Sequence, residues 1–234
     1  MVKALTFDVF GTVVDTRQSI IDELTQFGNQ KHINENWARF ADKWMRGYAS
    51  GVLNVNGADW VTVDEINRYN LDELLTEFNI EGLTEYEKLH VNEIWHRLKP
   101  WPDSPDGIAR LRQGGFKVAT LTNGNISLLK ELSKNMGITW DDTLSAEMVK
   151  RYKPDKMVYE MAVERLNLQP GQIMMVAAHR YDLDAAQSVG FKTAFVMRPD
   201  EWGPGGPHEE PGPSYDIIAD GIGDLAKKLG LIGT

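Results

Sequence analysis

The sequence predicts an α/β fold: a doubly wound, mainly parallel, Rossmann-like sheet with an inserted helical segment. Three observations predict this fold. Residues 2–7 form a short apolar segment that ends at Asp8 and a glycine turn, as a buried parallel strand does. Residues 106–197 alternate between helix-like and strand-like patterns, which is typical of doubly wound sheets. Between these two parts, residues 17–98 show only helical spacing.

Two runs of apolar residues spaced three and four apart define the helical segment: Ile20, Ile21, Leu24 and Phe27, and then Val63, Ile66, Leu71, Leu74, Leu75 and Phe78. The run from Pro100 to Pro105 then breaks any helix, and the alternation of strands and helices begins after it. We therefore divide the chain into an α/β core domain of residues 1–16 and 99–234 and a helical domain of residues 17–98.

The core domain is expected to follow a regular order of elements. The expected helices span residues 106–113, 126–136, 156–166 and 182–189, and the expected strands span residues 116–121, 143–145, 172–177, 192–197 and 216–219. The segment from Arg198 to Tyr215 holds five prolines and four glycines, so we expect a loop there that serves as a lid or an interface. A final helix is expected after the last strand.

The composition excludes several classes of function. The formal net charge of −9 and the isoelectric point near 5.1 argue against non-specific binding to nucleic acid or to an anionic membrane. The chain has no cysteine, so a disulfide, a thiolate metal ligand and a cysteine nucleophile are all excluded. The apolar segment after Lys3 is too short for a signal peptide, and no run of about 18 apolar residues occurs. We therefore expect a soluble, cytoplasmic protein.

Polar residues follow four of the expected strands. Asp8 comes directly after the first strand, where the reacting groups of open α/β sheets collect, so it is either a nucleophile or a residue that caps the next turn. Thr122 and Asn123 follow the next core strand and precede a helix. They either help that helix N-terminus to bind an anion, or they cap the helix.

The other two positions carry a cation and an acid. Lys153 lies just before a helix that begins near Pro154, so it either holds a nucleophilic carboxylate in its ionised form or belongs to a solvated basic surface. His179 and Asp182 follow the strand of residues 172–177, where Asp182 is also a good helix-starting residue. Four consecutive strand ends with such groups favour a catalytic site over chance placement.

These motifs resemble those of the haloacid dehalogenase superfamily, and within it those of the type II L-2-haloacid dehalogenases. The resemblance covers nearly the whole chain and rests on Phe7-Asp8-Val9-Phe10-Gly11-Thr12, on Leu121-Thr122-Asn123-Gly124-Asn125, on Tyr152-Lys153-Pro154-Asp155 with Tyr159, and on Val176 to His179 continuing through Asp182 to Gly190. It implies that residues 17–98 are a helical cap that closes over the site of a haloacid dehalogenase core.

Two departures from the phosphatases of this superfamily indicate the chemistry. Those enzymes carry a second aspartate two residues after the nucleophile, where this chain has Phe10, so the acid that protonates the leaving group is missing. They also carry an acidic residue four positions before Asp182 to hold Mg²⁺, where this chain has Ala178. Both losses count against phosphoryl transfer, whereas a halide leaves without a proton or a metal.

The resemblance therefore implies hydrolysis of short 2-haloacids to 2-hydroxyacids through an aspartyl ester, with fluoroacetate among the candidate substrates, and with no metal or other cofactor. The implied partners are the haloacid, the halide ion and water, without nucleic acid or membrane, and the usual assembly of such enzymes is a homodimer. The implied catalytic residues are Asp8 as nucleophile, Thr12 and Lys153 around it, and Asp182 and His179 at the hydrolytic water. The implied substrate-binding residues are Phe10 through nearby backbone N–H groups, Thr122, Asn123 and Tyr159.

The helical cap is expected to supply a cation for the departing halide. Relatives place an arginine directly after a tryptophan of a cap helix, but here Met45 follows Trp44 and the arginine comes one residue later. We expect Arg46 to hold the halide, with Arg39 as the alternative and a solvent-facing arginine as the third reading.

Two other functions stay open at this point. One is a Mg²⁺-dependent phosphatase or phosphonate hydrolase in which Asp184 replaces the missing acid at Ala178. The other is a binding protein that keeps the fold without catalysis. Loss of activity in a chelator would favour the first alternative, and inactivity with haloacids and phosphate esters would favour the second.

Overall fold

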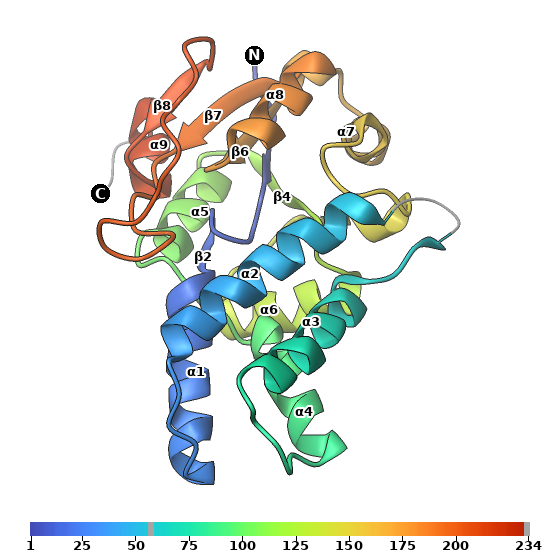
Figure 1. The fold of residues 1–234 in the computed structure, drawn as a ribbon. Coiled ribbons are helices and arrows are strands. Elements are labelled where there is room, and N and C mark those ends of the chain that lie inside the picture. The colour runs from blue at the N-terminus through green and yellow to red at the C-terminus, as the bar shows by residue number, and fades with distance from the viewer. Residues whose placement is uncertain (56–58, 232–234) are drawn as a thin grey trace.

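The computed structural model describes residues 1–55 and 59–231 of the chain. Its centre is a parallel sheet with the strand order β5-β4-β1-β6-β7-β8 (Figure 1). The strands are β1 (Ala4–Phe7), β4 (Lys117–Thr122), β5 (Asp142–Ser145), β6 (Ile173–Ala177), β7 (Lys192–Val196) and β8 (Ile217–Ala219). All of these pairs are parallel: helical connections carry the chain back between most of the strands, and the long loop after β7 does so before β8. The predicted doubly wound α/β fold is thereby confirmed.

Helices cover both faces of this sheet (Figure 1). On one face α5 (Ser104–Gln113) packs against α9 (Ile222–Lys228), and on the other α7 (Lys156–Leu166) packs against α8 (Arg180–Ser188). The helix α6 (Ile126–Met136) connects β4 with β5 and packs against β5. Two short 3₁₀ helices, η3 (Ala146–Met148) and η4 (Pro170–Gln172), lie in the connections before α7 and β6.

A layer of helices is inserted near the first strand and lies below the sheet in Figure 1. We call it the helical layer, and it consists of α1 (Thr16–Lys31), α2 (Trp37–Asn54), α3 (Val63–Glu77), α4 (Glu85–Asn92) and the 3₁₀ helix η2 (Glu93–His96). Two short strands, β2 (Val14–Asp15) and β3 (Lys99–Pro100), pair antiparallel at its two ends. The chain therefore leaves the sheet and returns to it at one place.

A polar cluster joins the helical layer to the core helix α6. The Nε2 atom of His96 lies 2.9 Å from a carboxylate oxygen of Asp64, and its Nδ1 atom lies 2.9 Å from Glu131. Asn125, which precedes α6, donates a hydrogen bond of 2.8 Å to Asp64. Burial opposes the protonation of His96, but both carboxylates outweigh it and raise its pKa above the ordinary value. The cluster fixes α3 next to the sheet edge that carries the site.

Two helix starts differ from the sequence prediction, while α6 and α7 have the predicted bounds. Helix α5 begins at Ser104 rather than at residue 106, because Pro105 is tolerated in the first helical turn, where its missing N–H is not needed. Helix α8 begins at Arg180 and not at Asp182. Asp182 therefore lies in the first turn of the helix, and His179 is the residue directly before the helix.

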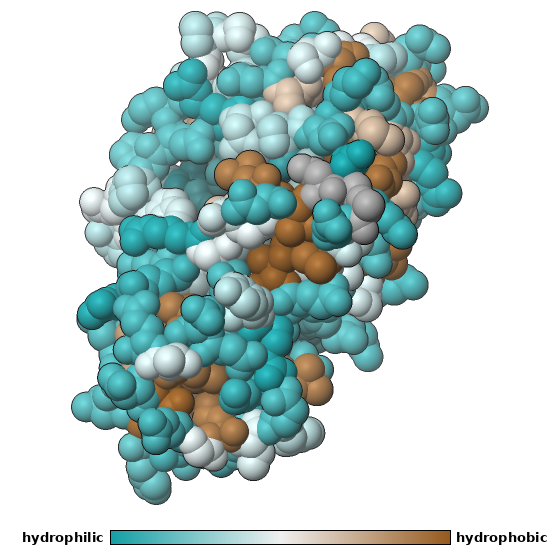
Figure 2. Space-filling model, turned by 45° about the vertical axis from the view of Figure 1, so that its right-hand side comes forward, coloured by the Kyte–Doolittle hydropathy of each residue, from teal (hydrophilic) through white to brown (hydrophobic). Residues whose placement is uncertain are grey.

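Hydrophilic residues cover most of the face in Figure 2, and hydrophobic residues gather near its middle. Among the described residues, no helix combines the length and the apolar character that crossing a bilayer would need. The core of the sheet is apolar, with Leu5 of β1 fully buried between the two neighbouring strands.

We predict that Leu5→Ala lowers the free energy of unfolding by about 2–5 kcal/mol, because it leaves a cavity at the centre of the sheet. The matched control is Leu53→Ala, since Leu53 is 65% exposed and its truncation should change stability by no more than about 0.5 kcal/mol. Urea denaturation measures both variants. Equal effects in the two variants would contradict the central position of β1.

Candidate active site

The candidate site lies where three neighbouring strands end. The register places Phe7, the last residue of β1, opposite Thr120 of β4 and Val176 of β6. The next residue along the chain is Asp8, whose N–H donates to the carbonyl of Val176 at 3.0 Å. Its side chain is only 7% exposed. The local sequence thus fixes one buried carboxylate at the carboxyl edge of the sheet.

Three side chains donate to the Asp8 carboxylate. Thr12 donates to Oδ2 at 3.0 Å, and the Nδ1 atom of His179 lies 3.0 Å from the same oxygen. The ammonium of Lys153 lies 3.4 Å from Oδ1. The Thr12 hydroxyl also accepts the N–H of Ala178 at 2.9 Å, which fixes the direction in which it donates. Oδ1 is therefore the less engaged oxygen, because 3.4 Å is long for a hydrogen bond.

The environment keeps Asp8 ionised. Burial alone would favour the neutral acid, but the charges of Lys153 and His179 and the hydrogen bonds from His179 and Thr12 outweigh it. Together they lower the pKa of Asp8 to about 2. Asp8 is therefore a carboxylate anion throughout the neutral range.

Asp182 lies behind Asp8 and is fully buried. Lys153 donates to one of its oxygens at 2.6 Å, and the hydroxyl of Tyr159 donates to the other at 2.7 Å. Burial raises the pKa of Asp182, because Lys153 offsets only part of the desolvation cost and the Asp8 charge adds to it. Both oxygens of Asp182 are engaged by the protein.

His179 bridges two carboxylates. Its Nδ1 faces Asp8, and its Nε2 lies 2.9 Å from an oxygen of Glu201 in the loop after β7. Burial opposes its protonation, but the charge of Glu201 and the bonds to both carboxylates raise its pKa well above the ordinary value. A protonated imidazole donates from both nitrogens, which is what two carboxylates require. The ring of Tyr181 stacks on His179 with centroids 5.8 Å apart.

A cavity of about 340 Å³ opens in front of Asp8. It is lined by the segments that follow β1 and β6, by the first residues of α1 and α8, by one face of α2, by η2 and by the loop after β7. The lining residues are Asp8, Phe10, Gly11, Thr16, Met45, Tyr48, Ala49, Trp95, His179, Tyr181, Glu201, Trp202, Pro207, His208 and Glu209. The rings of Phe10, Tyr48 and Trp95 pack with centroids 5.0–5.5 Å apart. The cavity is at the small end of the range for ligand sites.

Three residues expected at the substrate lie outside this lining. Thr122 is fully buried, and its hydroxyl has no hydrogen-bond partner among the described residues. Asn123 accepts the backbone N–H of Lys153 at 2.9 Å and thereby positions that residue. Tyr159 was expected to line the site; it is instead fully buried and hydrogen-bonded to Asp182.

The predicted cap cations are also outside the cavity. Met45 lines the cavity, whereas Arg46 is exposed and lies over the Trp202 ring at 5.6 Å. The reason is helical geometry: Met45, Tyr48 and Ala49 share one face of α2 at the i, i+3 and i+4 positions. Arg39 is 3.4 Å from a carboxylate of Glu77, on a different part of the helical layer. The expectation that Arg46 contacts the halide is therefore not supported by its position.

Sequence reasoning missed Tyr48, Trp95 and Glu201. Tyr48 could have been predicted from helical spacing, because it follows Trp44 by one turn of α2. Trp95 lies in a short 3₁₀ helix, and Glu201 lies in a proline- and glycine-rich loop. Neither shows a periodic pattern that predicts where its side chain points.

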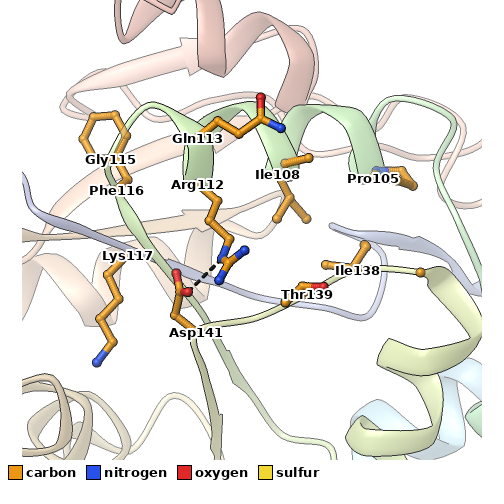
Figure 3. A pocket seen from close by; sticks show the side chains of 12 residues that line it. Pro105, Ile108, Arg112, Gln113, Gly115, Phe116, Lys117, Ile138, Thr139 and Asp141 are labelled. Atoms are coloured by element: carbon orange, nitrogen blue, oxygen red, sulfur yellow. Dashed lines mark hydrogen bonds and ion pairs between the residues drawn. The ribbon is translucent and has the colours of Figure 1, made fainter.

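A second hollow, of about 640 Å³, is shown in Figure 3. It lies near the start of β4, where Lys117 and Phe116 are found, and its lining includes Arg112 and Asp141, which form an ion pair of 2.7 Å. Reacting groups of open α/β sheets collect at the opposite edge. This hollow is therefore not the candidate site despite its larger volume.

Asp184, which the phosphatase alternative requires near the nucleophile, is exposed and accepts a hydrogen bond of 2.7 Å from Tyr215. Its side chain is thus occupied away from the cavity lining. Within residues 1–55 and 59–231, no group of three or more histidine, aspartate or glutamate side chains is arranged to hold a metal ion.

Comparisons with known proteins agree with this geometry. A family model for haloacid dehalogenase-like hydrolases matches residues 2–190. The solved structure of the defluorinating L-2-haloacid dehalogenase Rha0230 is 37% identical with a TM-score of 0.94, over 98% of this chain and 95% of that one. The L-2-haloacid dehalogenase PA0810 is 35% identical with a TM-score of 0.91, over 98% and 100% of the two chains.

A curated relative is more distant in sequence. The (S)-2-haloacid dehalogenase of Xanthobacter autotrophicus is 28% identical over 204 residues, which is 85% of this chain and 76% of that protein. The resemblance to haloacid dehalogenases expected from the four motifs is thereby confirmed. With its parallel sheet, its buried strand-end carboxylate and a family match over residues 2–190, the chain belongs to the haloacid dehalogenase-like hydrolases.

Proposed function

We propose that this protein is a hydrolase of carbon–halide bonds, of the (S)-2-haloacid dehalogenase type, that converts short 2-haloacids to 2-hydroxyacids. One observation carries the proposal: an ionised Asp8, held by Lys153 and His179, faces a small cavity with aromatic walls. Curated and solved relatives carry this activity in their names, and one of them is named as defluorinating.

The first step is attack by Asp8 on the carbon that carries the halogen. The less engaged oxygen, Oδ1, forms the new C–O bond, the carbon inverts, and the halide leaves with the bonding electrons. The halide leaves without a proton. This step is therefore compatible with Phe10 in the position where the phosphatases carry the acid that protonates the leaving group. The aromatic edges of Phe10 and Trp95 carry partial positive charge and suit a departing anion.

The second step is hydrolysis of the Asp8 ester. Water attacks the ester carbon, so the oxygen that leaves with the product is one that belonged to Asp8. Thr12 and Lys153 hold the carboxylate and stabilise the charge that develops on it. The engaged oxygens of Asp182 suit a different role from the one expected from the sequence: Asp182 holds Lys153 in place.

Tyr48 is the proposed contact of the substrate carboxylate, and direct binding by Asn123 stays a prediction from the sequence because that residue lies outside the cavity lining. Tyr48 lines the cavity, and Asn123 counteracts part of the rise that burial causes in the pKa of Tyr48. Arg46 acts only through Trp202 in this proposal. The helical layer serves as the cap that closes the cavity. Three expectations stay predictions from the sequence: that Thr122 binds the substrate directly, that the protein forms a homodimer, and that it is cytoplasmic.

Asp8→Asn is expected to reduce turnover of 2-chloropropionate by at least about 10³-fold, because an amide is a far weaker nucleophile than a carboxylate. Halide release measures the effect, and mass spectrometry of the variant excludes deamidation back to aspartate. The matched control is Asp184→Asn, which removes an exposed carboxylate near the same sheet and should leave the rate unchanged.

Isotope labelling tests the same step in the unmodified enzyme. A single turnover in ¹⁸O water should label Asp8 and leave the first product unlabelled, because water attacks the ester and not the substrate. Label in the first product would show direct attack by water and would remove Asp8 as the nucleophile.

Dehalogenation is expected to be unchanged after dialysis against EDTA, and para-nitrophenyl phosphate should be a poor substrate. The reason is that Phe10 and Ala178 replace the acid and one metal ligand of the phosphatases, while Lys153 supplies positive charge between Asp8 and Asp182. Halide release with and without added Mg²⁺ is the measurement. Strong stimulation by Mg²⁺ would favour the phosphatase-type alternative instead.

The rate of the first step is expected to be independent of pH down to about pH 4, because the pKa of Asp8 is lowered to about 2 and the carboxylate stays ionised. In His179→Asn the acid limb should move to higher pH, since the imidazole that helps to lower this pKa is lost. Quenched-flow measurement of halide release in one turnover gives both profiles. A limb near pH 6 in the unmodified enzyme would mean that Asp8 is not held ionised.

A further inference from the structure

We propose that Glu201 is a positioning residue for the second step, and that it holds His179 as the base that takes a proton from the attacking water. This inference rests on the proposed dehalogenase function. It adds a role for the loop after β7. It also makes His179 the base, whereas the sequence had suggested Asp182.

The contacts form one chain from the loop to the nucleophile. Glu201 meets Nε2 of His179 at 2.9 Å, and Nδ1 of the same ring meets Asp8 at 3.0 Å. The Glu201 side chain is 13% exposed and that of His179 is 15% exposed. Nδ1 thus already lies beside the Asp8 carboxyl group, whose carbon the water must attack. A water at that carbon is within the range in which Nδ1 can take a proton from it.

The fold leaves space for Glu201 at this position. Gly11 has a φ of +77°, and a Cβ there would come 2.1 Å from Oε1 of Glu201 and 3.1 Å from the His179 ring. A side chain at Gly11 would therefore displace the carboxylate from the imidazole. This turn is formed directly after the nucleophile, so the same segment positions Asp8 and admits Glu201.

The loop that carries Glu201 is tied down on both sides of it. Arg198 donates to the carbonyl of Thr12 at 2.9 Å and pairs with Asp103 at 2.9 Å. The N–H of Glu201 donates to the carbonyl of Arg198 at 3.2 Å. Trp202 lies under the guanidinium of Arg46 on α2. These anchors restrict where the Glu201 carboxylate can lie.

Asp182 is poorly placed for the same task. It is fully buried, it is absent from the cavity lining, and its two oxygens accept from Lys153 and Tyr159. A proton on Asp182 would have to displace one of these bonds. His179 lines the cavity and has one nitrogen directed at the reacting carboxyl group.

The proton balance of the cycle follows from these contacts. In the free enzyme His179 is protonated between two carboxylates. Attack by Asp8 releases halide and converts its carboxylate to a neutral ester, so one of the two anions is lost and the imidazolium releases its proton to solvent. Water then attacks the ester carbon, one of its protons goes to Nδ1, and the hydroxyacid leaves with the other. The free enzyme is restored, and the net products are hydroxyacid, halide and one proton.

Titratable groups from every element around it surround His179. These groups are Asp8 after β1, Glu201, His208 and Glu209 of the loop, Tyr181 of α8, Tyr48 of α2, and Lys153 and Asp182 behind Asp8. Glu201 and Asp8 are the two that contact the imidazole through hydrogen bonds. Loss of the Asp8 charge leaves Glu201 as the anion that orients the ring.

The test compares Glu201→Gln with Glu201→Asp and with Glu210→Gln. Glu210 is an exposed residue of the same loop, so its variant removes the same charge without touching His179. Each enzyme is mixed with 2-chloropropionate in quenched flow, halide is counted against enzyme, and the Asp8 peptide is weighed by mass spectrometry.

Glu201→Gln should release one halide per active site at a normal rate and then turn over about 10²-fold more slowly, the usual scale for one acid–base group. The Asp8 ester should accumulate in this variant. The acid limb of its kcat profile should move to lower pH, because removal of the Glu201 charge lowers the pKa of His179. Glu201→Asp should restore part of the rate, and Glu210→Gln should behave as the unmodified enzyme.

Other results overturn the inference. A normal kcat in Glu201→Gln, or a slow halide burst without ester accumulation, would show that Glu201 does not serve the hydrolysis step. An unchanged pH profile with a lowered rate would reduce Glu201 to a structural role. The burst amplitude reports folded sites, so misfolding is recognised separately. If the unmodified enzyme releases no halide from any haloacid, the proposed function fails and this inference fails with it.

Discussion

The structure depends on one buried ammonium group shared by two carboxylates. Lys153 is only 2% exposed and contacts Asp8 and Asp182 at 3.4 Å and 2.6 Å. Removal of one partner from a buried ion pair costs about 3–5 kcal/mol, because the remaining charge loses its compensation. The three residues come from segments that are far apart in the sequence, so this cluster fixes the end of β1, the first turn of α8 and the loop before α7 relative to each other. The nucleophile is ionised because of the same arrangement.

The fold and the residues around the nucleophile could be predicted from the sequence. The apolar strand before Asp8 and the helix signals at Pro154 and Asp182 are local, and the parallel sheet then brings their polar ends together. Local pattern was enough because each of these residues directly follows a strand or begins a helix. Lys153 and Asp182 are accordingly in contact with each other, as are Asp8 and Thr12.

The parts of the site that α2 and the loop after β7 supply could not be predicted from the sequence. Arg46 and Met45 differ by one position on α2, which is about 100° around the helix, so a small shift in the expected alignment exchanged a cation for an apolar side chain. Glu201 depends on the anchoring of a long loop by Arg198 and on the space above Gly11. These are tertiary contacts, and no local propensity encodes them. Tyr159 was placed at the substrate because its pairing with Asp182 could not be inferred from spacing.

The central claim is that Asp8 becomes covalently attached to the substrate. The most direct measurement is rapid acid quenching of the unmodified enzyme during turnover of bromoacetate, followed by peptide mass spectrometry. The account predicts a carboxymethyl ester on Asp8 that appears within the first turnover and disappears when substrate is exhausted. Halide release at the full rate with an unmodified Asp8 peptide at every time point would contradict it.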